Sequence, residues 1–555
     1  MTPSTASRSP SLKREATTFR EDNTMNLITS PFGSIGHALA ATVRAAKESG
    51  DRLITIPNGT YDIDWKDAPT VTACVANHGH NGFKSAALAI EDIDDLTVDG
   101  GGSTFILHGC MDFAIVSRAK NITIRNLTVR CADTCNFQGR VIASEGGEVT
   151  VKLEEHAKLH LHGTHLWQKF FDNNWEPMGR TLDYIAETRE LRRGSGDENF
   201  GMKFHDIPKE YDAENDLLYL HDVPVAPPVG DVIVFTMSRR AGQAFLLSHS
   251  ENVTVEDVTV GTCWGMGFIA QKCENVTIRR CTVTPDGNRC WSAGQDATHF
   301  VNCRGTVIIE DSRFENQLDD AVNLHGIYTR VDGISGEQIL VRYAHFQTRG
   351  IDIYAPGDRI QFMRPENQMP VGFATVTAVD VLNPDTTILT LADTEGEIAQ
   401  GMIVENLSDE ADAYIRRNLI RNNRARGMLI AAKGHIEITD NHFHSGGAAI
   451  QFESDPFHWY ECGGTNDVLI ARNFFDDCRH GKWGRAVIDI KQRRETVEGF
   501  YYHSTIDVRD NNFTQTNVPC VAADNVGNFL FGNNEYTCEI PFTAAHCVVN
   551  GEKVE

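Results

Sequence analysis

The chain lacks an apolar run long enough to cross a membrane, and it lacks the paired cysteine spacing of a zinc finger. Basic residues are also scarce: 51 lysines and arginines face 76 aspartates and glutamates, a formal net charge of −25. This charge argues against nucleic acids and anionic membranes as partners. The N-terminus does not show the basic-then-apolar layout of a signal peptide, so we expect a cytoplasmic protein, with secretion by another route left open.

The 14 cysteines are scattered along the chain. Several, such as Cys281, fall at inward-facing strand positions, where a small apolar side chain fits. Cys131 and Cys135 leave a disulfide or a metal-ligand pair open as an alternative. A reduced setting is the default expectation.

In place of these features the chain has an internal repeat. A turn residue is followed by apolar residues at offsets 0, 2, 5 and 7, as in NVTVEDVTV. The steps of two are strand alternation, and the step of three is a bend. The shortest step between copies occurs three times, from Val253 to Val276, from Ala413 to Ile436 and from Ile506 to Phe529. A repeat of this length predicts an all-β fold of stacked coils, a parallel β-helix. The copies start at Ile122, Val253, Val276, Val307, Ala413, Ile436, Val468, Ile506 and Phe529.

Asparagine occupies the bend of the last five copies. Stacked side-chain amides can form hydrogen bonds along the axis of such a solenoid while their backbones turn. The alternative is an ordinary sandwich with Asn-rich turns, which does not explain nine copies in one phase. The five asparagines are Asn418, Asn441, Asn473, Asn511 and Asn534.

Two long interruptions divide the repeat, and both contain strand-like runs. We therefore predict two small β-barrel-like domains inserted into one solenoid, at 131–240 and 331–410. Residues 1–24 are predicted to be a disordered extension, and 25–130 to hold a capped helix at 34–49 and the first coils. Residues 241–330 hold the coils with an acidic cluster, and 411–555 hold the C-terminal coils.

The acidic cluster consists of Asp296 and the pair Asp319–Asp320. Asp319 follows Asp296 by the shortest repeat step, and each of the two lies two residues before a predicted strand, at Thr298 and at Ala321. The three carboxylates should therefore meet at one corner of neighbouring coils. Crowded carboxylates acquire different pKa values, as acid-catalysed glycoside cleavage requires. The alternative is that one acid of the pair only caps a turn.

Polar and aromatic residues near this corner are candidates to bind a sugar, although each could equally be structural. One set follows the acids on the same strands, and a second set lies in the run QFESDPFHWYECGG. No basic cluster is expected around the acidic pair. The candidates are His299, Asn323, His325, Glu453, Trp459 and Glu461.

The run GFIAQKCENVTIRRCTV, with DATHFVNCRG and IEDSRFENQLDDAVNLHGIY after it, resembles glycoside hydrolase family 110. The resemblance covers about residues 25–545. It implies a right-handed β-helix with two inserted barrels and an exo-acting α-1,3-galactosidase of blood group B type that inverts the anomeric carbon. It also implies that Asp296, Asp319 and Asp320 are the catalytic acids, without saying which is acid and which is base. No metal or organic cofactor is implied.

Other hypotheses remain open on the sequence. A polygalacturonase-like hydrolase uses the same fold and similar acids, but it needs basic residues to bind uronates. A polysaccharide lyase would need a basic catalytic residue beside a calcium site. A glycan-binding β-helix without catalysis is the non-enzymatic alternative. The expected partner is a galactoside oligosaccharide or glycoconjugate, and a homodimer formed through an insertion is left open.

Overall fold

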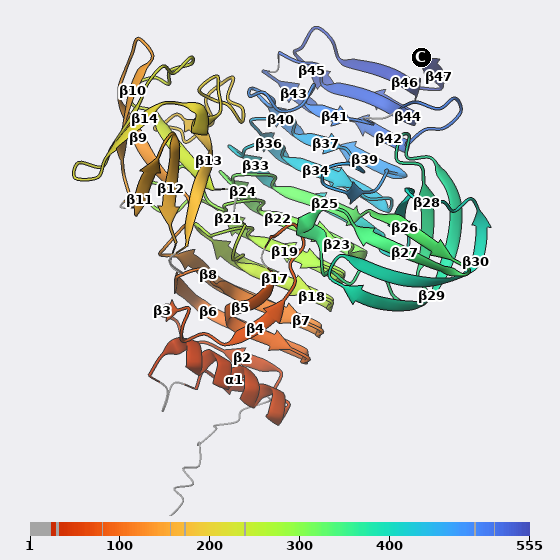
Figure 1. The fold of residues 1–555 in the computed structure, drawn as a ribbon, viewed down its shortest axis with the longest axis horizontal. Coiled ribbons are helices and arrows are strands. Elements are labelled where there is room, and N and C mark those ends of the chain that lie inside the picture. Colours follow the sequence, from red (N-terminus) through yellow and green to blue (C-terminus); the bar gives the residue numbers. More distant parts are fainter. Residues whose placement is uncertain are drawn as a thin grey trace, which may run out of the picture.

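The computed structural model describes residues 24–28, 33–79, 81–155, 157–170, 174–237, 240–492, 495–515 and 517–554. The predicted disordered extension lies outside these residues, apart from Thr24. The described chain forms a right-handed parallel β-helix carrying two inserted domains, as predicted. Figure 1 shows the coils stacked from the N-terminal helix at one end to the C-terminal strands at the other.

Three stacks of parallel strands form the walls of the solenoid. The first contains β1 (Thr24–Asn26), β2 (Leu53–Thr55), β6 (Asp94–His108), β8 (Lys120–Cys131), β18 (Glu251–Val260), β20 (Glu274–Arg279), β23 (Arg304–Glu310), β32 (Ala411–Arg416), β35 (His435–Thr439), β39 (Asp467–Ala471), β42 (His503–Arg509) and the end of β44 (Val521–Gly532). The second contains β3 (Thr60–Asp64), the ends of β6, β8 and β18, β21 (Thr282–Val283), β24 (Arg313–Glu315), β33 (Leu419–Arg421), β36 (His442–His444), β40 (Phe474–Asp476), β43 (Asn512–Thr514) and β45 (Glu535–Tyr536).

The third stack carries the residues that matter most below. It contains β5 (Gly82–Glu91), β7 (Asp112–Ser117), β17 (Phe245–Ser248), β19 (Phe268–Gln271), β22 (Thr298–Val301), β25 (Val322–Ile327), β34 (Met428–Ala431), β37 (Ile450–Phe452), β41 (Ile488–Ile490), the start of β44, and β46 (Phe542–Val549). Three antiparallel strands border it: β4 (Thr70–Ala73) on β5, β38 (Glu461–Cys462) on β25, and β47 (Glu552–Val554) on β46.

The strand register confirms the predicted repeat. Val253 pairs with Val276, and Ile506 pairs with Phe529, one repeat step apart in each case. The register also continues across both interruptions, since β8 pairs with β18 and β23 pairs with β32. Each insertion is therefore a long excursion from one coil, after which the solenoid resumes.

The inward-facing residues of the repeat form one continuous apolar core. Val253, Val255 and Val276 are fully buried, because each coil covers the inner face of the next. Aromatic rings repeat the spacing of the coils. Phe443 stacks on Phe475 with ring centroids 5.0 Å apart, and Phe475 stacks on Phe513 at 4.6 Å, close to the 4.7–4.9 Å between neighbouring strands.

The five bend asparagines form the predicted ladder. The Asn441 Nδ2 donates to the Asn473 Oδ1 at 3.0 Å, and the backbone N–H of Asn441 donates to the same oxygen at 3.0 Å. The Asn473 Nδ2 donates in turn to the Asn511 Oδ1 and to the carbonyl of Ile438. Each amide thus satisfies buried backbone groups of the coil before it.

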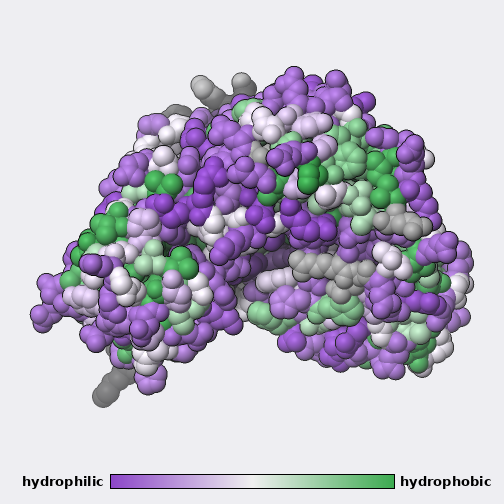
Figure 2. Space-filling model, turned by 90° about the horizontal axis from the view of Figure 1, so that it is seen from above, coloured by the Kyte–Doolittle hydropathy of each residue, from purple (hydrophilic) through white to green (hydrophobic). Residues whose placement is uncertain are grey.

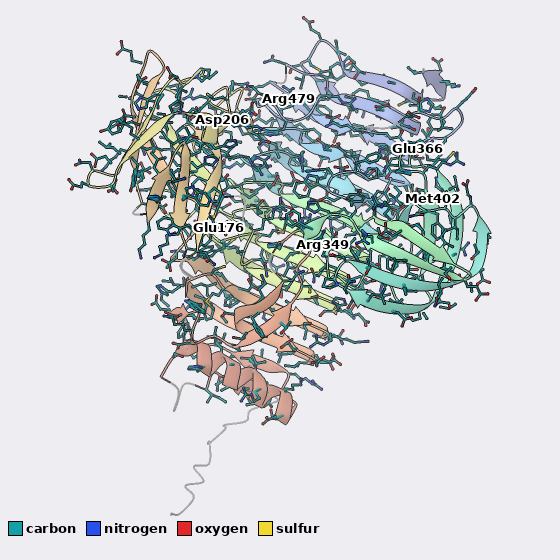
Figure 3. All side chains as sticks on the ribbon, in the orientation of Figure 1. Glu176, Asp206, Arg349, Glu366, Met402 and Arg479 are labelled. Atoms are coloured by element: carbon teal, nitrogen blue, oxygen red, sulfur yellow. The ribbon has the colours of Figure 1, made fainter. Side chains whose placement is uncertain are left out.

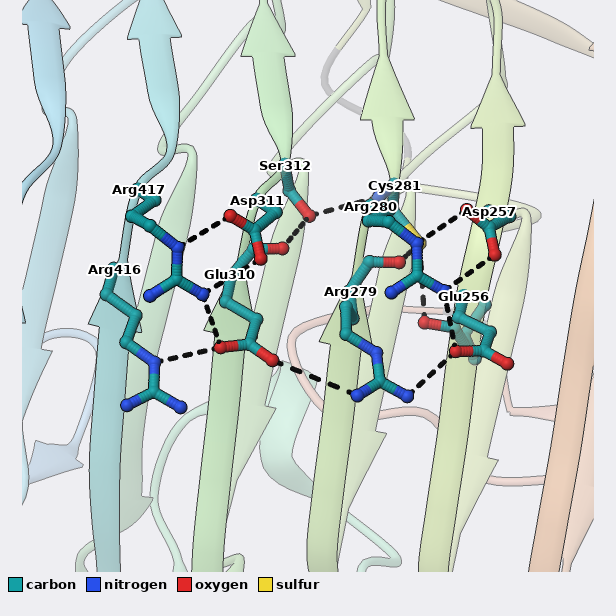
Figure 4. Close-up of polar contacts among 11 residues, drawn as sticks. Glu256, Asp257, Arg279, Arg280, Cys281, Glu310, Asp311, Ser312, Arg416 and Arg417 are labelled. Carbon is teal, nitrogen blue, oxygen red and sulfur yellow. Dashed lines mark hydrogen bonds and ion pairs between the residues drawn. The ribbon is translucent and has the colours of Figure 1, made fainter.

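The residue before each bend turns with a positive φ, and its side chain forms an outer ladder of alternating charge (Figure 4). Arg280 pairs with Asp257 at 2.7 Å, and Arg417 pairs with Asp311 at 2.7 Å. These side chains are 39–47% exposed, so each pair should contribute less than about 1 kcal/mol. The buried amide ladder is therefore the stronger element at this edge.

We expect Asn473→Ala to lower the free energy of unfolding by about 2–4 kcal/mol, because it leaves the backbone N–H of Asn441 and the carbonyl of Ile438 buried without a partner. Urea unfolding followed by circular dichroism measures the change. Arg417→Gln, on the outer ladder, is the control and should cost less than about 1 kcal/mol. An equal, small loss in both variants would show that the amide ladder does not stabilise the coils.

The first insertion contains an eight-stranded antiparallel sheet in the order β11-β12-β13-β16-β9-β10-β15-β14. Its elements are β9 (Phe137–Glu145), β10 (Glu148–Leu153), β11 (Leu159–His162), β12 (His165–Lys169), β13 (Trp175–Tyr184), the 3₁₀ helix η1 (Phe204–Asp206), β14 (Lys209–Asp212), β15 (Leu217–Leu220) and β16 (Val232–Met237). Figure 3 labels Glu176 and Asp206 on this domain.

The second insertion is a closed six-stranded barrel on the opposite side of the solenoid in Figure 1. Its elements are β26 (Thr329–Ser335), β27 (Gln338–Tyr343), the 3₁₀ helix η2 (Phe346–Thr348), β28 (Arg359–Met363), β29 (Pro370–Asn383), β30 (Thr386–Gly396) and β31 (Ile403–Asn406). A barrel has no free edge strand, so this domain offers no strand for further pairing.

The predicted N-terminal helix is α1 (Ile35–Ser49), which covers the first coils. The Ser34 side chain accepts from the backbone N–H of His37 at its start, and Gly50 turns with a φ of 74° at its end. This capping confirms the predicted boundaries. Of the helices in the described residues, none is long and apolar enough to cross a membrane.

Candidate active site

The acidic corner lies on the third stack, with a register one residue away from the predicted one. Thr298 pairs with Val322, so Asp296 lies beside Asp320 on the next coil, and Asp319 lies diagonally. The backbone bond from the Ala297 N–H to the Asp320 carbonyl, 2.9 Å, fixes this arrangement. The prediction that Asp296 and Asp319 occupy matching positions is therefore wrong, because this part of the stack advances by one residue more than the shortest repeat step.

The three carboxylates nevertheless converge. One oxygen of each lies within 4.8 Å of the others. Asp296, Asp319 and Asp320 are 3%, 9% and 1% exposed, and all three line a cleft of about 590 Å³. Figure 2 shows the molecule hollowed between two lobes, with hydrophilic residues around the hollow. We call these three residues the carboxylate trio.

Four arginines share this cleft, which contradicts the expectation that no basic cluster surrounds the acids. The Arg424 Nη1 lies 2.9 Å from the Asp319 Oδ1. Arg426 donates to Asp320 through its Nη2, at 2.7 Å, and through its backbone N–H, at 3.1 Å. The other two arginines are Arg180 and Arg240.

The arginine cluster was not predicted from the sequence, because its members come from segments that lie far apart along the chain. Arg424 and Arg426 lie between β33 and β34, on the coil after the second insertion. Arg180 lies on β13 of the first insertion, and Arg240 follows β16. One signal was available: the repeat alignment of Val322 with Met428 places Arg426 beside Asp320.

These surroundings separate the pKa values of the trio. Burial, helped by the charge of Asp319, raises the pKa of Asp296 to about 8. Burial also raises the pKa of Asp320, with the two neighbouring carboxylates acting in the same direction. Burial acts on Asp319 in the same way, but the four arginines outweigh it and hold its pKa below the ordinary value. At neutral pH the trio therefore contains both ionised and protonated carboxyl groups, as general acid–base chemistry needs.

A buried histidine pair supports a proton on Asp296. The His325 Nδ1 donates to the Gly326 carbonyl at 2.7 Å, so its Nε2 accepts when the ring is neutral. The His299 Nε2 lies 3.1 Å from that atom and then donates to it. The His299 Nδ1, left with a lone pair, faces the Asp296 Oδ2 at 2.6 Å. With both rings neutral, Asp296 supplies the proton of this bond. Burial lowers the pKa of His299 well below its ordinary value, which agrees.

This placement differs from the predicted role of the two histidines. His299 is 0% exposed, His325 is 2% exposed, and neither lines the cleft. A strand pointing its polar residues towards a buried network, rather than towards the solvent, explains the difference. Both rings are buried, and His299 contacts Asp296 from inside the third stack.

The other four predicted binding residues do line the cleft: Asn323, Glu453, Trp459 and Glu461. Glu461 opens β38 and accepts from the Asn77 Nδ2 at 3.0 Å. Sequence reasoning missed Asn77, which lies near the N-terminus, and Asp197 and Trp483, which come from separate loops. The Trp483 Nε1 donates to the Asp197 Oδ1 at 3.3 Å across the cleft wall.

Trp459 is the predicted sugar platform, and the Arg240 guanidinium lies 5.3 Å from its ring centroid. We expect Trp459→Ala to raise KM about three- to tenfold, because it removes an aromatic contact and the support for Arg240. Trp459→Phe keeps an aromatic ring and should change KM less than threefold. Steady-state kinetics of both variants measure this, and an unchanged KM in Trp459→Ala would exclude the platform.

Known proteins resemble this chain along most of its length. An "Alpha-1,3-galactosidase B" from Phocaeicola vulgatus is 27% identical over 547 residues, covering 91% of this chain and 89% of the relative. An "Alpha-1,3-galactosidase A" from Shewanella woodyi is 28% identical over 510 residues, covering 89% and 82%. The family model described as GLAA-B beta-barrel domain II matches residues 338–398, within the second insertion. The chain is a homologue of the α-1,3-galactosidases. The resemblance to glycoside hydrolase family 110 is thereby confirmed.

Two further matches cover this chain and the other protein to different extents. An "Alpha-1,3-galactosidase B" from Akkermansia muciniphila is 27% identical over 510 residues, which cover 90% of this chain, and the chain spans 64% of that relative's length. A polygalacturonase from Erwinia carotovora is 10% identical with a TM-score of 0.43, covering 97% of this chain and 99% of the other. The similarity to α-1,3-galactosidases thus comes from sequence, and the fold assignment comes from the strand pairing above.

Proposed function

We propose that this protein is an exo-acting α-1,3-galactosidase, which hydrolyses terminal α-1,3-linked galactose from blood group B-type glycans by inversion. The carboxylate trio, buried in one cleft with separated pKa values, carries the proposal. It supplies a protonated carboxyl for the leaving oxygen and an ionised carboxylate for the attacking water. The names of homologues that cover nine-tenths of the chain support the substrate.

The shape of the cleft supports removal of a terminal sugar. Arg180 and Asp197 of the first insertion line it together with Trp459 and Glu461, from the segment at β38. A cleft of about 590 Å³ lies within the range of small-ligand sites. Because an inserted domain as well as the coils lines the cleft around the trio, the cleft favours binding the end of a chain over binding its middle.

Inversion rests on the family relationship rather than on distance. Inverting carboxyl pairs are usually about 6.5–9.5 Å apart, whereas the oxygens of the trio approach within 4.8 Å of one another. Inversion then requires the attacking water and the leaving oxygen to lie between Asp296 and Asp319, the two members of the trio that are diagonal to each other. The anomer of the first galactose released decides this part of the proposal.

The second candidate is a polygalacturonase-like hydrolase, which the four cleft arginines favour. Three of them are already paired with members of the trio: Arg424 and Arg240 with Asp319, and Arg426 with Asp320. Because these arginines are paired with carboxylates, they leave less positive charge to bind a uronate than four unpaired arginines would. This pairing favours the neutral galactoside.

Hydrolysis of a matched set of substrates tests the proposal. Release of galactose from linear and fucosylated α-1,3-galactosides, with none from α-1,4- or α-1,6-linked galactosides, is the expected result. Cleavage of oligogalacturonates without release of galactose would contradict the proposal and establish the second candidate. The ratio of rates on linear and fucosylated substrates measures the preference between them.

A further inference from the structure

A second group of convergent side chains lies outside the cleft, where the first insertion meets the coils. One nitrogen of His444, one nitrogen of His480 and one carboxylate oxygen of Asp477 lie within 4.8 Å of one another. His444 ends β36, and Asp477 and His480 follow β40 on the next coil. Figure 3 labels Arg479, the neighbour of His480, between the coils and the first insertion.

Both histidines are oriented by their backbone surroundings. The His444 Nδ1 donates to the Asp476 carbonyl at 3.0 Å, and the His480 Nδ1 donates to the Asp477 carbonyl at 2.9 Å. A neutral ring that carries its proton on Nδ1 has a lone pair on Nε2. The His444 Nε2 is buried without a hydrogen-bond partner. Donation of Nδ1–H to a backbone carbonyl is the usual way in which metal-binding histidines are held.

The first insertion adds another acceptor to the same place. The Glu190 Oε1 lies 3.8 Å from the His444 Nε2. Asp477 is held through its Oδ2 by Arg193, which leaves its Oδ1 for another partner. Two imidazoles and the Asp477 carboxylate thus converge, with the Glu190 carboxylate beside His444, and such a set of groups is suited to hold a cation.

Hydrogen bonds on both sides fix the loop that carries Glu190. The Gly194 N–H donates to the His480 carbonyl at 2.9 Å, and the Lys482 N–H donates to the Ser195 carbonyl at 2.8 Å. The same loop continues to Asp197, which accepts from the Arg424 Nη2 at 2.8 Å in the cleft. The convergent group therefore lies at the point where a wall of the cleft is attached to the solenoid.

We propose that His444, His480 and Asp477, completed by Glu190, bind one divalent transition-metal ion, with Zn²⁺ the best match. Two imidazole nitrogens and carboxylate oxygens are ligands that Zn²⁺ prefers in tetrahedral sites. Because the ligands come from the insertion and from two coils, the ion fastens the loop of residues 185–203 to the solenoid. Its role is structural, separate from the chemistry of the trio.

Metal content and melting temperature test the proposal without reference to galactosidase activity. Untagged protein is treated with EDTA, dialysed, incubated with ZnCl₂ and desalted. We expect about one zinc per chain and a rise in Tm of about 2–5 °C. His444→Gln and His480→Gln should each lose both effects. His442→Gln is the matched control, because His442 lies on the same strand but its ring packs on Phe474, with centroids 4.9 Å apart.

Several results would overturn the proposal. They are the absence of retained zinc in the wild type, and zinc content that is unchanged in His444→Gln and His480→Gln. Loss of zinc in Asp320→Asn would place the ion at the trio instead. If Tm changes with acid but not with zinc, the group of His444, His480 and Asp477 binds a proton and not a metal ion. Circular dichroism confirms folding, and Glu190→Gln, which alters a 40% exposed side chain, provides a milder variant that should weaken zinc binding.

Discussion

Asp319→Asn should lower kcat/KM for an α-1,3-galactoside by roughly 10³-fold, within the range that general acid or base catalysis contributes. The substitution keeps the shape of a side chain that is 9% exposed and removes its charge. It also removes the ionised member of the trio, whose low pKa depends on the cleft arginines. Steady-state release of galactose measures the loss.

Asp311→Asn is the matched control. Asp311 belongs to the coil that leads to Asp319, but its side chain lies on the outer charge ladder and pairs with Arg417 (Figure 4). It should leave kcat/KM within about twofold of wild type. Equal activity in Asp319→Asn and wild type would remove the trio from the mechanism.

α-Galactosyl fluoride separates the roles within the trio. Fluoride leaves without a proton, so a variant that lacks only the general acid retains activity on it. We expect one of Asp296→Asn, Asp319→Asn and Asp320→Asn to retain fluoride hydrolysis while all three lose hydrolysis of the disaccharide. That variant identifies the acid. Loss of both reactions in every variant would contradict a division of the trio into acid and base.

Arg424→Gln should move the acid limb of the pH–rate profile to higher pH. Arg424 contacts Asp319 at 2.9 Å, and it is the arginine that contributes most to the low pKa of that carboxyl. Arg424 lowers the pKa of Asp319, so its removal raises that pKa. The ionised form is then lost at a higher pH as the solution is acidified.

The alkaline limb provides an internal reference in the same experiment. Burial raises the pKa of Asp296 to about 8 and also raises the pKa of Asp320, so these protonated carboxyl groups lose their protons as the solution becomes alkaline. Activity of the wild type should therefore fall above about pH 8. Profiles of kcat/KM from pH 3 to 9 for wild type, Arg424→Gln and the surface control Arg417→Gln make the comparison. An acid limb that is unmoved in Arg424→Gln would contradict the proposed electrostatics.

The coils could be predicted because their cause is local. Val253, Val255, Val258 and Val260 repeat a spacing that only a bent strand with one buried face explains, and the next copy begins at Val276, directly beside Val253. The asparagine ladder is equally local, since each amide meets the same position of the adjacent coil. Neither insertion changes the stacking of the coils, because the strand register resumes after each one.

The cleft could be predicted only in part, because its walls come from distant segments. Asp296 and Asp320 lie on adjacent coils, so spacing brought them together. The register still shifted by one position, because the step from Thr298 to Val322 in the third stack is longer by one than the step from Val253 to Val276 in the first. Arg180 on the first insertion reaches the same cleft through domain packing, which no repeat spacing records.

The most direct test of the account is a ¹H NMR time course of galactose-α-1,3-galactose hydrolysis by wild type and Asp319→Asn. We expect wild type to release β-galactose first, which later mutarotates, and the variant to release almost none. Initial α-galactose would contradict inversion. Release of no galactose from this substrate or from its fucosylated form would contradict the proposed activity itself.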